Sequence, residues 1–152
     1  MLVERVLAEA GYEHYEVSNY ALPHYRARHN SHYWDSTPYL GIGPAAHSYD
    51  GLSRQWNVSS VQRYIAGEEP EREQLTDEEL YEEYLMTRLR TADGFTTDDF
   101  RARFGEKRTR KLLERATALC REGLLNESDG RLQIPPGRLL LSDRVIGSLF
   151  EL

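Results

Sequence analysis

The residues best suited to chemistry lie together in the stretch His29-Asn30-Ser31-His32-Tyr33-Trp34. Imidazole is the commonest metal-binding side chain and a ligand of haem iron, and neighbouring aromatic rings can stack on a planar macrocycle. The stretch therefore predicts a haem-binding surface. It also fits a simpler interpretation, in which Tyr33 and Trp34 plug the open end of a sheet and the histidines only form hydrogen bonds. The residue types alone favour this simpler interpretation.

Other chemistries fit the sequence less well. A zinc site built from histidines has no cysteine nearby and matches no common ligand spacing; its members would be His24, His29, His32 and His47. The segment Gly41-Ile42-Gly43-Pro44 lacks glycines that lead directly into a helix N-terminus, so a phosphate-binding loop is not expected. No sharp nucleophile turn surrounds Ser18, so a hydrolytic site is not indicated.

Length and composition set the frame for these residues. A chain of 152 residues fits one domain, or a small domain with part of another. No apolar run approaches the ~20 residues of a membrane span, and the first residues lack the layout of a signal peptide, so we expect a cytoplasmic protein. The single cysteine, Cys120, cannot hold an iron–sulfur cluster, and we expect it to be a small buried residue.

The charged residues are unevenly distributed, although the net charge of -6 gives no general attraction to nucleic acid. Acidic side chains crowd residues 68–83, and basic side chains crowd residues 101–115. The basic stretch fits the recognition helix of a DNA-binding winged helix, which would contact phosphates. It fits better as a partner of the acidic stretch, so nucleic-acid binding is the weaker alternative.

The first half of the chain shows the pattern of an α/β repeat. Apolar residues at helical spacing predict a helix over 2–10 that ends at Gly11, and alternation predicts a strand over 14–20. Because no strand precedes the helix, we expect a fold that is cut open on its N-terminal side. The sequence next predicts a loop over 21–38 and short strands over 39–43 and 53–58. A short helix over 59–65, capped by Ser59 or Ser60, is predicted to follow.

The second half is predicted to be mainly helical. Thr76 and Glu79 form a capping box at the start of a first helix. Two more helices are expected next, over 96–104 and 109–122. They are followed by a hairpin about Asp129-Gly130 and a last helix capped by Ser142-Asp143. Three helices followed by a hairpin is the order of a winged helix-turn-helix, which indicates a fold more than a function.

Residues 10–48 resemble the HemN/HemW family, whose members are often described as oxygen-independent coproporphyrinogen III oxidases. The segments that carry the resemblance are residues 10–21, Arg28-His29-Asn30 and residues 39–48. The resemblance implies an α+β fold: the terminal elements of a partial (β/α) barrel in 1–66, a linker in 67–75, and a helical, winged-helix-like C-terminal domain in 76–152. It also implies that a longer parent holds S-adenosylmethionine and a [4Fe–4S] cluster through a CxxxCxxC motif, which this sequence lacks.

Within this family, an HNxxYW motif marks the HemW-type haem chaperones and is absent from the true oxidases. The resemblance therefore implies that His29, Asn30, Tyr33 and Trp34 bind haem, with His29 as the ligand of the iron. We expect a chain that binds haem or a porphyrin, passes haem to an accepting protein and carries no catalytic residue. The alternative is a fragment of an oxygen-independent coproporphyrinogen III oxidase of porphyrin biosynthesis.

Overall fold

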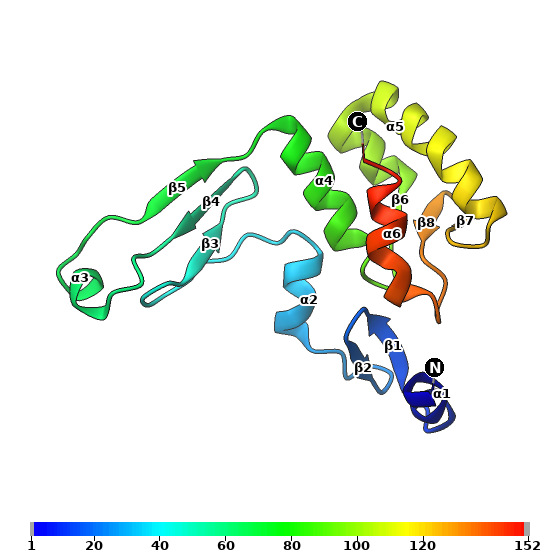
Figure 1. The fold of residues 1–152 in the computed structure, drawn as a ribbon, viewed down its shortest axis with the longest axis horizontal. Coiled ribbons are helices and arrows are strands. Elements are labelled where there is room, and N and C mark those ends of the chain that lie inside the picture. The colour runs from blue at the N-terminus through cyan, green and yellow to red at the C-terminus, as the bar shows by residue number, and fades with distance from the viewer. Residues whose placement is uncertain (1, 151–152) are drawn as a thin grey trace. The chain divides into compact units, whose positions relative to one another are not determined.

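The computed structural model describes residues 2–150, which form helices and small antiparallel sheets (Figure 1). These residues fall into two compact units: unit 1 comprises residues 2–35 and 82–150, and unit 2 comprises residues 36–81. The fold is thus of the predicted mixed class of helix and sheet. The domain boundaries predicted at residues 66 and 76 stay a prediction.

Unit 1 begins with α1 (Leu2–Glu9), β1 (Glu13–Glu16), β2 (Asn19–Ala21) and α2 (Arg28–Trp34). Unit 2 contains β3 (His47–Tyr49), β4 (Ser53–Trp56), α3 (Val61–Ile65) and β5 (Glu71–Gln74). Helix α4 (Asp77–Arg88) begins in unit 2 and ends in unit 1. Unit 1 then continues with β6 (Phe95–Thr96), α5 (Thr97–Arg121), β7 (Asn126–Ser128), β8 (Arg131–Gln133), the 3-10 helix η1 (Leu139–Leu141) and α6 (Ser142–Gly147).

The predicted N-terminal helix is confirmed as α1, but the single strand predicted over residues 14–20 is wrong. The chain turns back at Val17 and Ser18, so that β1 and β2 form an antiparallel hairpin. The Ser18 N–H donates to the Glu16 carboxylate at 3.2 Å, and the Val17 N–H donates to the carbonyl of Arg90 at 2.9 Å. A distant segment therefore helps to hold a turn whose two central residues are neither glycine nor asparagine.

In unit 2, the strand predicted over residues 39–43 is reduced to one bridge between Tyr39 and Tyr49. Side chains satisfy the backbone groups that follow. The Gly41 N–H donates to Ser48 Oγ at 3.0 Å, the Asn57 amide donates to the Gly43 carbonyl at 2.9 Å, and the Gly43 N–H donates to the Tyr64 hydroxyl at 3.1 Å. A Cβ at Gly41 would lie 2.1 Å from the carbonyl oxygen of His47, so this position requires glycine.

The remaining elements of unit 2 form a sheet in the order β3-β4-β5. The strand predicted after the Asp50-Gly51 turn is confirmed as β4, and the short helix is confirmed as α3 with Ser60 as its N-cap. The stretch predicted as a linker, residues 67–75, contains β5, because its backbone pairs with β4 in antiparallel register. Its four side chains are all exposed, so no alternating burial pattern marks it as a strand in the sequence.

The helix-capping signals at Thr76 and Thr96 are confirmed, but the cap predicted at Ser142-Asp143 is wrong, because α6 begins at Ser142 after Leu141 and no side chain caps it. The Thr76 N–H donates to the Glu79 carboxylate at 2.8 Å and the Glu79 N–H donates to Thr76 Oγ1 at 3.2 Å, which is the reciprocal pair of a capping box. Thr96 caps α5, which is kinked at Gly105 (φ 81°) and so corresponds to the two helices predicted there. The hairpin about Asp129-Gly130 is confirmed as β7 and β8, which pair with β6 in the order β6-β8-β7.

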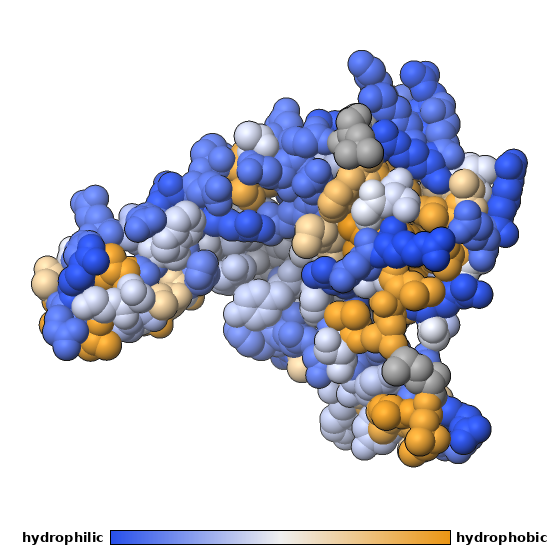
Figure 2. Space-filling model, viewed as in Figure 1, coloured by the Kyte–Doolittle hydropathy of each residue, from blue (hydrophilic) through white to orange (hydrophobic). Residues whose placement is uncertain are grey.

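The core of unit 1 includes a cluster of aromatic side chains from α4, β6 and α5, together with aliphatic side chains from β8, η1 and α6. The rings of Tyr84, Phe95, Phe100 and Phe104 pack edge to face or tilted, with centroid distances between 4.9 and 5.7 Å. By contrast, α1 buries none of its residues, and Figure 2 shows hydrophobic side chains gathered at its surface.

Among residues 2–150, no helix is both long enough and apolar enough to span a bilayer.

Candidate functional site

The histidine-rich stretch singled out in the sequence lies on helix α2, within the segment 21–38 that was predicted to be a loop. That prediction was wrong for residues 28–34. No side chain caps the helix at Ala27, but the Ala27 carbonyl accepts hydrogen bonds from the Ser31 N–H at 2.9 Å and the Ser31 hydroxyl at 3.0 Å. These local bonds close the first turn of a helix that lacks a capping signal in its sequence.

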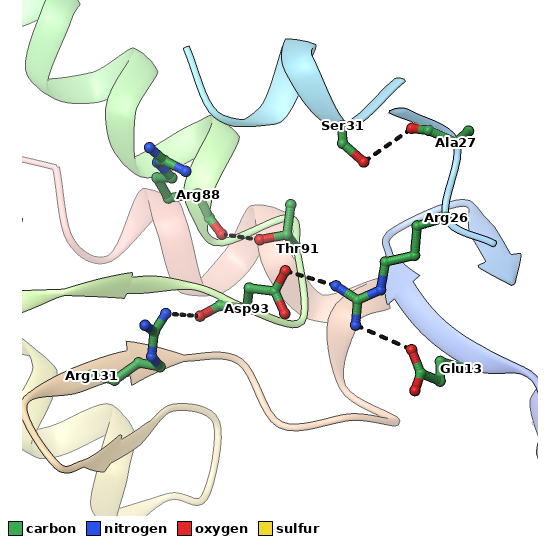
Figure 3. A network of polar contacts seen from close by, with 8 residues as sticks. All are labelled: Glu13, Arg26, Ala27, Ser31, Arg88, Thr91, Asp93 and Arg131. Carbon is green, nitrogen blue, oxygen red and sulfur yellow. Dashed lines mark hydrogen bonds and ion pairs between the residues drawn. The ribbon is translucent and has the colours of Figure 1, made fainter. Parts of the chain in front are cut away.

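An arginine just before α2 ties the helix to the rest of unit 1 (Figure 3). Arg26 donates to Asp93 at 2.8 Å and to Glu13 of β1 at 3.2 Å, and its guanidinium lies 5.6 Å from the centre of the Tyr15 ring. Partial burial lowers the pKa of Arg26, but the hydrogen bonds and charges of Asp93 and Glu13 outweigh this effect and raise the pKa overall. Arg26 therefore stays charged and fixes the start of α2.

The exposed face of α2 carries His29 and Tyr33, which are four residues apart and so lie on the same side of the helix. The Tyr33 hydroxyl lies 3.3 Å from His29 Nε2, and the two rings meet edge to face with centroids 5.2 Å apart. Both side chains reach solvent. A planar ligand could therefore approach this pair without displacing the packed side of the helix.

Asn30 and Trp34 lie one residue further along α2, about 100° round the helix from His29 and Tyr33, and are only partly exposed. The Asn30 side-chain nitrogen and Trp34 Nε1 are buried atoms with no hydrogen-bond partner among the described residues. The four residues of the predicted haem site thus form an exposed pair and a partly buried pair on adjoining sides of one helix. The sequence identifies the residue types but does not say which side faces solvent.

A pocket of about 150 Å³ lies beside the buried side of α2 and is lined by Trp34, Arg26, Arg88, Tyr15 and others. Arg88 donates to the carbonyl of Asp35 at 3.1 Å, directly after the end of α2, while its Nε atom has no acceptor within residues 2–150. An unpaired buried donor costs free energy, so this pocket suits a small group with acceptor oxygens. Neither Arg26 nor Arg88 was predicted as a site residue, because single arginines far apart in sequence give no pattern.

A second pocket, of about 340 Å³, lies between α1 and the β1–β2 hairpin. His14 stacks on Tyr20 with ring centroids 4.2 Å apart, and its Nδ1 lies 3.8 Å from a carboxylate oxygen of Glu4. The His14 side chain is only 7% exposed. These contacts fit a histidine that joins the helix to the hairpin, and the alternation of residues 14–20 gave no sign of the stacking.

Metal-binding geometry is limited in the described part of the chain. Within residues 2–150, no three His, Cys, Asp or Glu side chains are arranged to hold a metal ion, so the zinc alternative has no support. Haem makes a different demand, because the porphyrin supplies four ligands and the protein adds one or two axial ligands. The pair on the exposed face of α2 meets that smaller demand.

Two basic residues at the start of α5, Arg101 and Arg103, have partners close by. Arg101 pairs with Glu106 at 2.8 Å and with Asp98, both on the same helix, and Arg103 lies 5.5 Å from the centre of the Tyr84 ring. Arg101 therefore pairs inside α5 itself, and the pairing of the basic stretch with the acidic residues 68–83 stays a prediction. Cys120, predicted to be buried, is partly exposed, and burial followed by the charge of Glu127 raises the pKa of its thiol.

Comparison with known proteins identifies one group of relatives. The family model described as the HemN C-terminal domain matches residues 75–140. Heme chaperone HemW of Mycobacterium tuberculosis (strain H37Rv) is 36% identical, over 97% of this chain and 37% of the relative. Heme chaperone HemW of Escherichia coli (strain K12) is 33% identical, over 97% of this chain and 39% of the relative. The chain thus spans less than two fifths of these relatives.

A solved structure shares the fold. It is the coproporphyrinogen III oxidase HemN from Escherichia coli, described as a radical SAM enzyme, with a TM-score of 0.71. The similarity covers 97% of this chain and 39% of that chain, at 15% sequence identity. At this identity, the likeness concerns the fold alone.

Proposed function

Because the chain belongs to the HemN/HemW family and corresponds to the C-terminal portion of its relatives, we propose that it binds haem on α2 and delivers it to an accepting protein. The observation that carries the proposal is the exposed pair of His29 and Tyr33, which offers an axial ligand to haem iron. Sequence identity of 36% over 97% of the chain to a protein named as a heme chaperone supports it.

In this proposal the four motif residues have two different tasks. His29 and Tyr33 contact haem on the exposed face. His29 is the ligand of the haem iron, as the sequence predicts. Asn30 and Trp34 are partly buried against unit 1, so their main task is to fix the orientation of the helix, and they contact only the edge of the haem. A change at Trp34 should therefore affect folding as well as binding.

We extend the proposal to the architecture and cofactors of a longer parent. Residues 1–66 would complete a partial (β/α) barrel, and residues 76–152 would form a winged-helix-like domain. The parent would bind S-adenosylmethionine and a [4Fe–4S] cluster, since a relative in Danio rerio is named as a radical S-adenosyl methionine domain-containing protein. The cluster ligands would come from outside this chain, whose only cysteine is Cys120.

The two alternatives have weaker support. A coproporphyrinogen III oxidase fragment rests on a fold likeness at 15% identity, whereas the chaperone relatives reach 36%. Formation of the decarboxylated product by the full-length protein under anaerobic conditions would favour the oxidase. A nucleic-acid-binding module would need free basic residues, but Arg101 is paired within α5. A salt-dependent DNA shift would reveal such binding.

Haemin titration tests the proposal directly. The Soret band of haemin is followed while the 152-residue chain is added, and the affinity of His29→Ala is compared with that of the unchanged chain. Loss of an iron ligand should weaken binding by at least about 10-fold, equivalent to 1.4 kcal/mol. His32→Ala is the matched control, since His32 is also exposed on α2. Equal spectra and affinities for His29→Ala and the unchanged chain would remove His29 from the site.

A further inference from the structure

We propose that the pocket between α1 and the β1–β2 hairpin binds a small, neutral aromatic molecule with an N–H or O–H group, and that His14 accepts the hydrogen bond from this group. The lining of this pocket includes no residue of the HNxxYW motif, so the site is independent of haem binding on α2. A buried nitrogen atom, the side chains around it and the space beside it together point to such a ligand.

The buried nitrogen atom is His14 Nδ1, which has no hydrogen-bond partner among residues 2–150. The other ring nitrogen, Nε2, lies 3.4 Å from the Val17 carbonyl oxygen. Because a carbonyl oxygen can only accept, Nε2 carries the hydrogen in this contact, and Nδ1 of the neutral ring then has a lone pair to offer. The His14 side chain is only 7% exposed, and a buried acceptor without a donor costs free energy. A ligand that donates to Nδ1 removes this cost.

The carboxylate of Glu4 favours a donor at the same point. One of its oxygen atoms lies 3.8 Å from His14 Nδ1, which is too far for a hydrogen bond. Two acceptors cannot bond to each other, but one N–H placed between them can donate to both, as in three-centre hydrogen bonds. Such a ligand group therefore leaves the Glu4 side chain where it is.

The other walls of the pocket favour an aromatic body. The apolar part of the lining comes from Ala8, Tyr12, Tyr20, Ala92 and Pro136. The rings of His14 and Tyr20 are nearly parallel, with an interplanar angle of 10°, and Tyr12 is 39% exposed, so the lining runs from solvent to the buried imidazole. The volume of about 340 Å³ is at the lower end of the ~300–1,000 Å³ found for small-molecule sites, so a molecule of one or two fused rings suits it.

The charged groups in the lining favour a neutral ligand. Arg26 donates to Glu13 at 3.2 Å, so these two charges offset each other (Figure 3). The guanidinium of Arg26 and the carboxylates of Glu4 and Glu13 line one small space, so a full charge of either sign on the ligand would meet a like charge there. Indole combines a flat apolar body, no charge and one N–H donor, and it therefore serves as the probe.

Calorimetric titration with two probes of the same shape tests the role of His14. Benzofuran has an oxygen atom where indole has its N–H, so it offers no donor. The unchanged 152-residue chain should bind indole at least about 10-fold more tightly than benzofuran, because only indole satisfies the buried acceptor. His14→Phe keeps a ring beside Tyr20 but removes Nδ1, so the preference for indole should disappear. His14→Asn, which keeps a side-chain acceptor, should restore part of this preference.

A second pair of variants tests the pocket itself. Ala8→Leu places a larger side chain in the lining and should weaken the binding of both probes by about 10-fold. Ala10→Leu is the matched control, because Ala10 is also exposed but does not line the pocket, and both affinities should be unchanged.

Three results would overturn the inference. The first is that neither probe binds the unchanged chain, and the second is that both bind it equally well. The third is that the preference for indole persists in His14→Phe. Urea unfolding shows whether each variant is folded. If His14→Phe does not fold, equal effects of Ala8→Leu and Ala10→Leu on indole binding would place the probe outside this pocket and would likewise refute the site.

Discussion

The ion pair between Arg26 and Asp93 should stabilise unit 1 by a measurable amount. Their atoms lie 2.8 Å apart, and the Arg26 side chain is 35% exposed while that of Asp93 is 64% exposed. Exposed pairs contribute about 0.2–1 kcal/mol. Because Arg26 also bonds to Glu13 and is mostly covered, we expect a coupling in the upper half of this range, about 0.5–1 kcal/mol.

A double-mutant cycle measures this coupling. Urea unfolding of Arg26→Met, Asp93→Asn and the double variant gives the interaction free energy, while Met keeps most of the aliphatic stem. Arg26→Met alone should lower the free energy of unfolding by about 2 kcal/mol, since it loses two ion pairs and the contact of its charge with the Tyr15 ring. In 1 M salt the coupling should shrink, because the Debye length falls to about 3 Å.

The pair of Arg5 and Glu9 on α1 serves as the control for this cycle. Its atoms are 3.8 Å apart and both side chains are 71% exposed, so its coupling should be at most about 0.3 kcal/mol. If the Arg26 cycle gives no more than the control cycle at low salt, the argument that Arg26 fixes the start of α2 is refuted. Faster amide exchange at Ser31 in Arg26→Met would support that argument independently.

A glycine substitution and an NMR titration test the fold elsewhere. Gly94→Ala should lower the free energy of unfolding, measured in urea, by about 3 kcal/mol or more, because φ is 58° and a Cβ would lie 2.0 Å from the Leu132 carbonyl oxygen. Gly123→Ala is the control: its Cβ would meet no other atom, so the loss should be only about 1 kcal/mol. Asp50 should titrate by NMR at about 2 rather than 3.8, because the Ser53 hydroxyl and then backbone amides lower its pKa. Its stabilisation of the turn is therefore complete above pH 3.8 and is lost as the pH falls toward 2, and a normal pKa would contradict these hydrogen bonds.

Local signals were sufficient where a single side chain decides the structure. Thr76 with Glu79, Ser60 before α3, and Asp129-Gly130 between β7 and β8 each act within three or four residues of chain. Their energetics do not depend on distant segments, so the sequence predicts them correctly.

Long-range hydrogen bonds explain where prediction from the sequence failed. The turn at Val17 depends on the carbonyl of Arg90, and the irregular backbone near Gly41 depends on the side chain of Asn57. In both places a local pattern predicted a continuous strand, but partners far along the chain offered other hydrogen bonds. The site shows the same limit: the residue types of the HNxxYW motif predict haem contact, but only the structure shows that His29 is exposed and Trp34 is partly buried.

The loop around Gly41 has a consequence for how this surface can change. Its backbone is held by Ser48, Asn57 and Tyr64, while Leu40 and Ile42 are 75% and 83% exposed. The groups that fix the shape of the loop are thus different from the groups that the loop displays. Substitutions at Leu40 and Ile42 can therefore change the exposed surface while the backbone of the loop keeps its conformation. A library made at these two positions would sample new surfaces on one backbone.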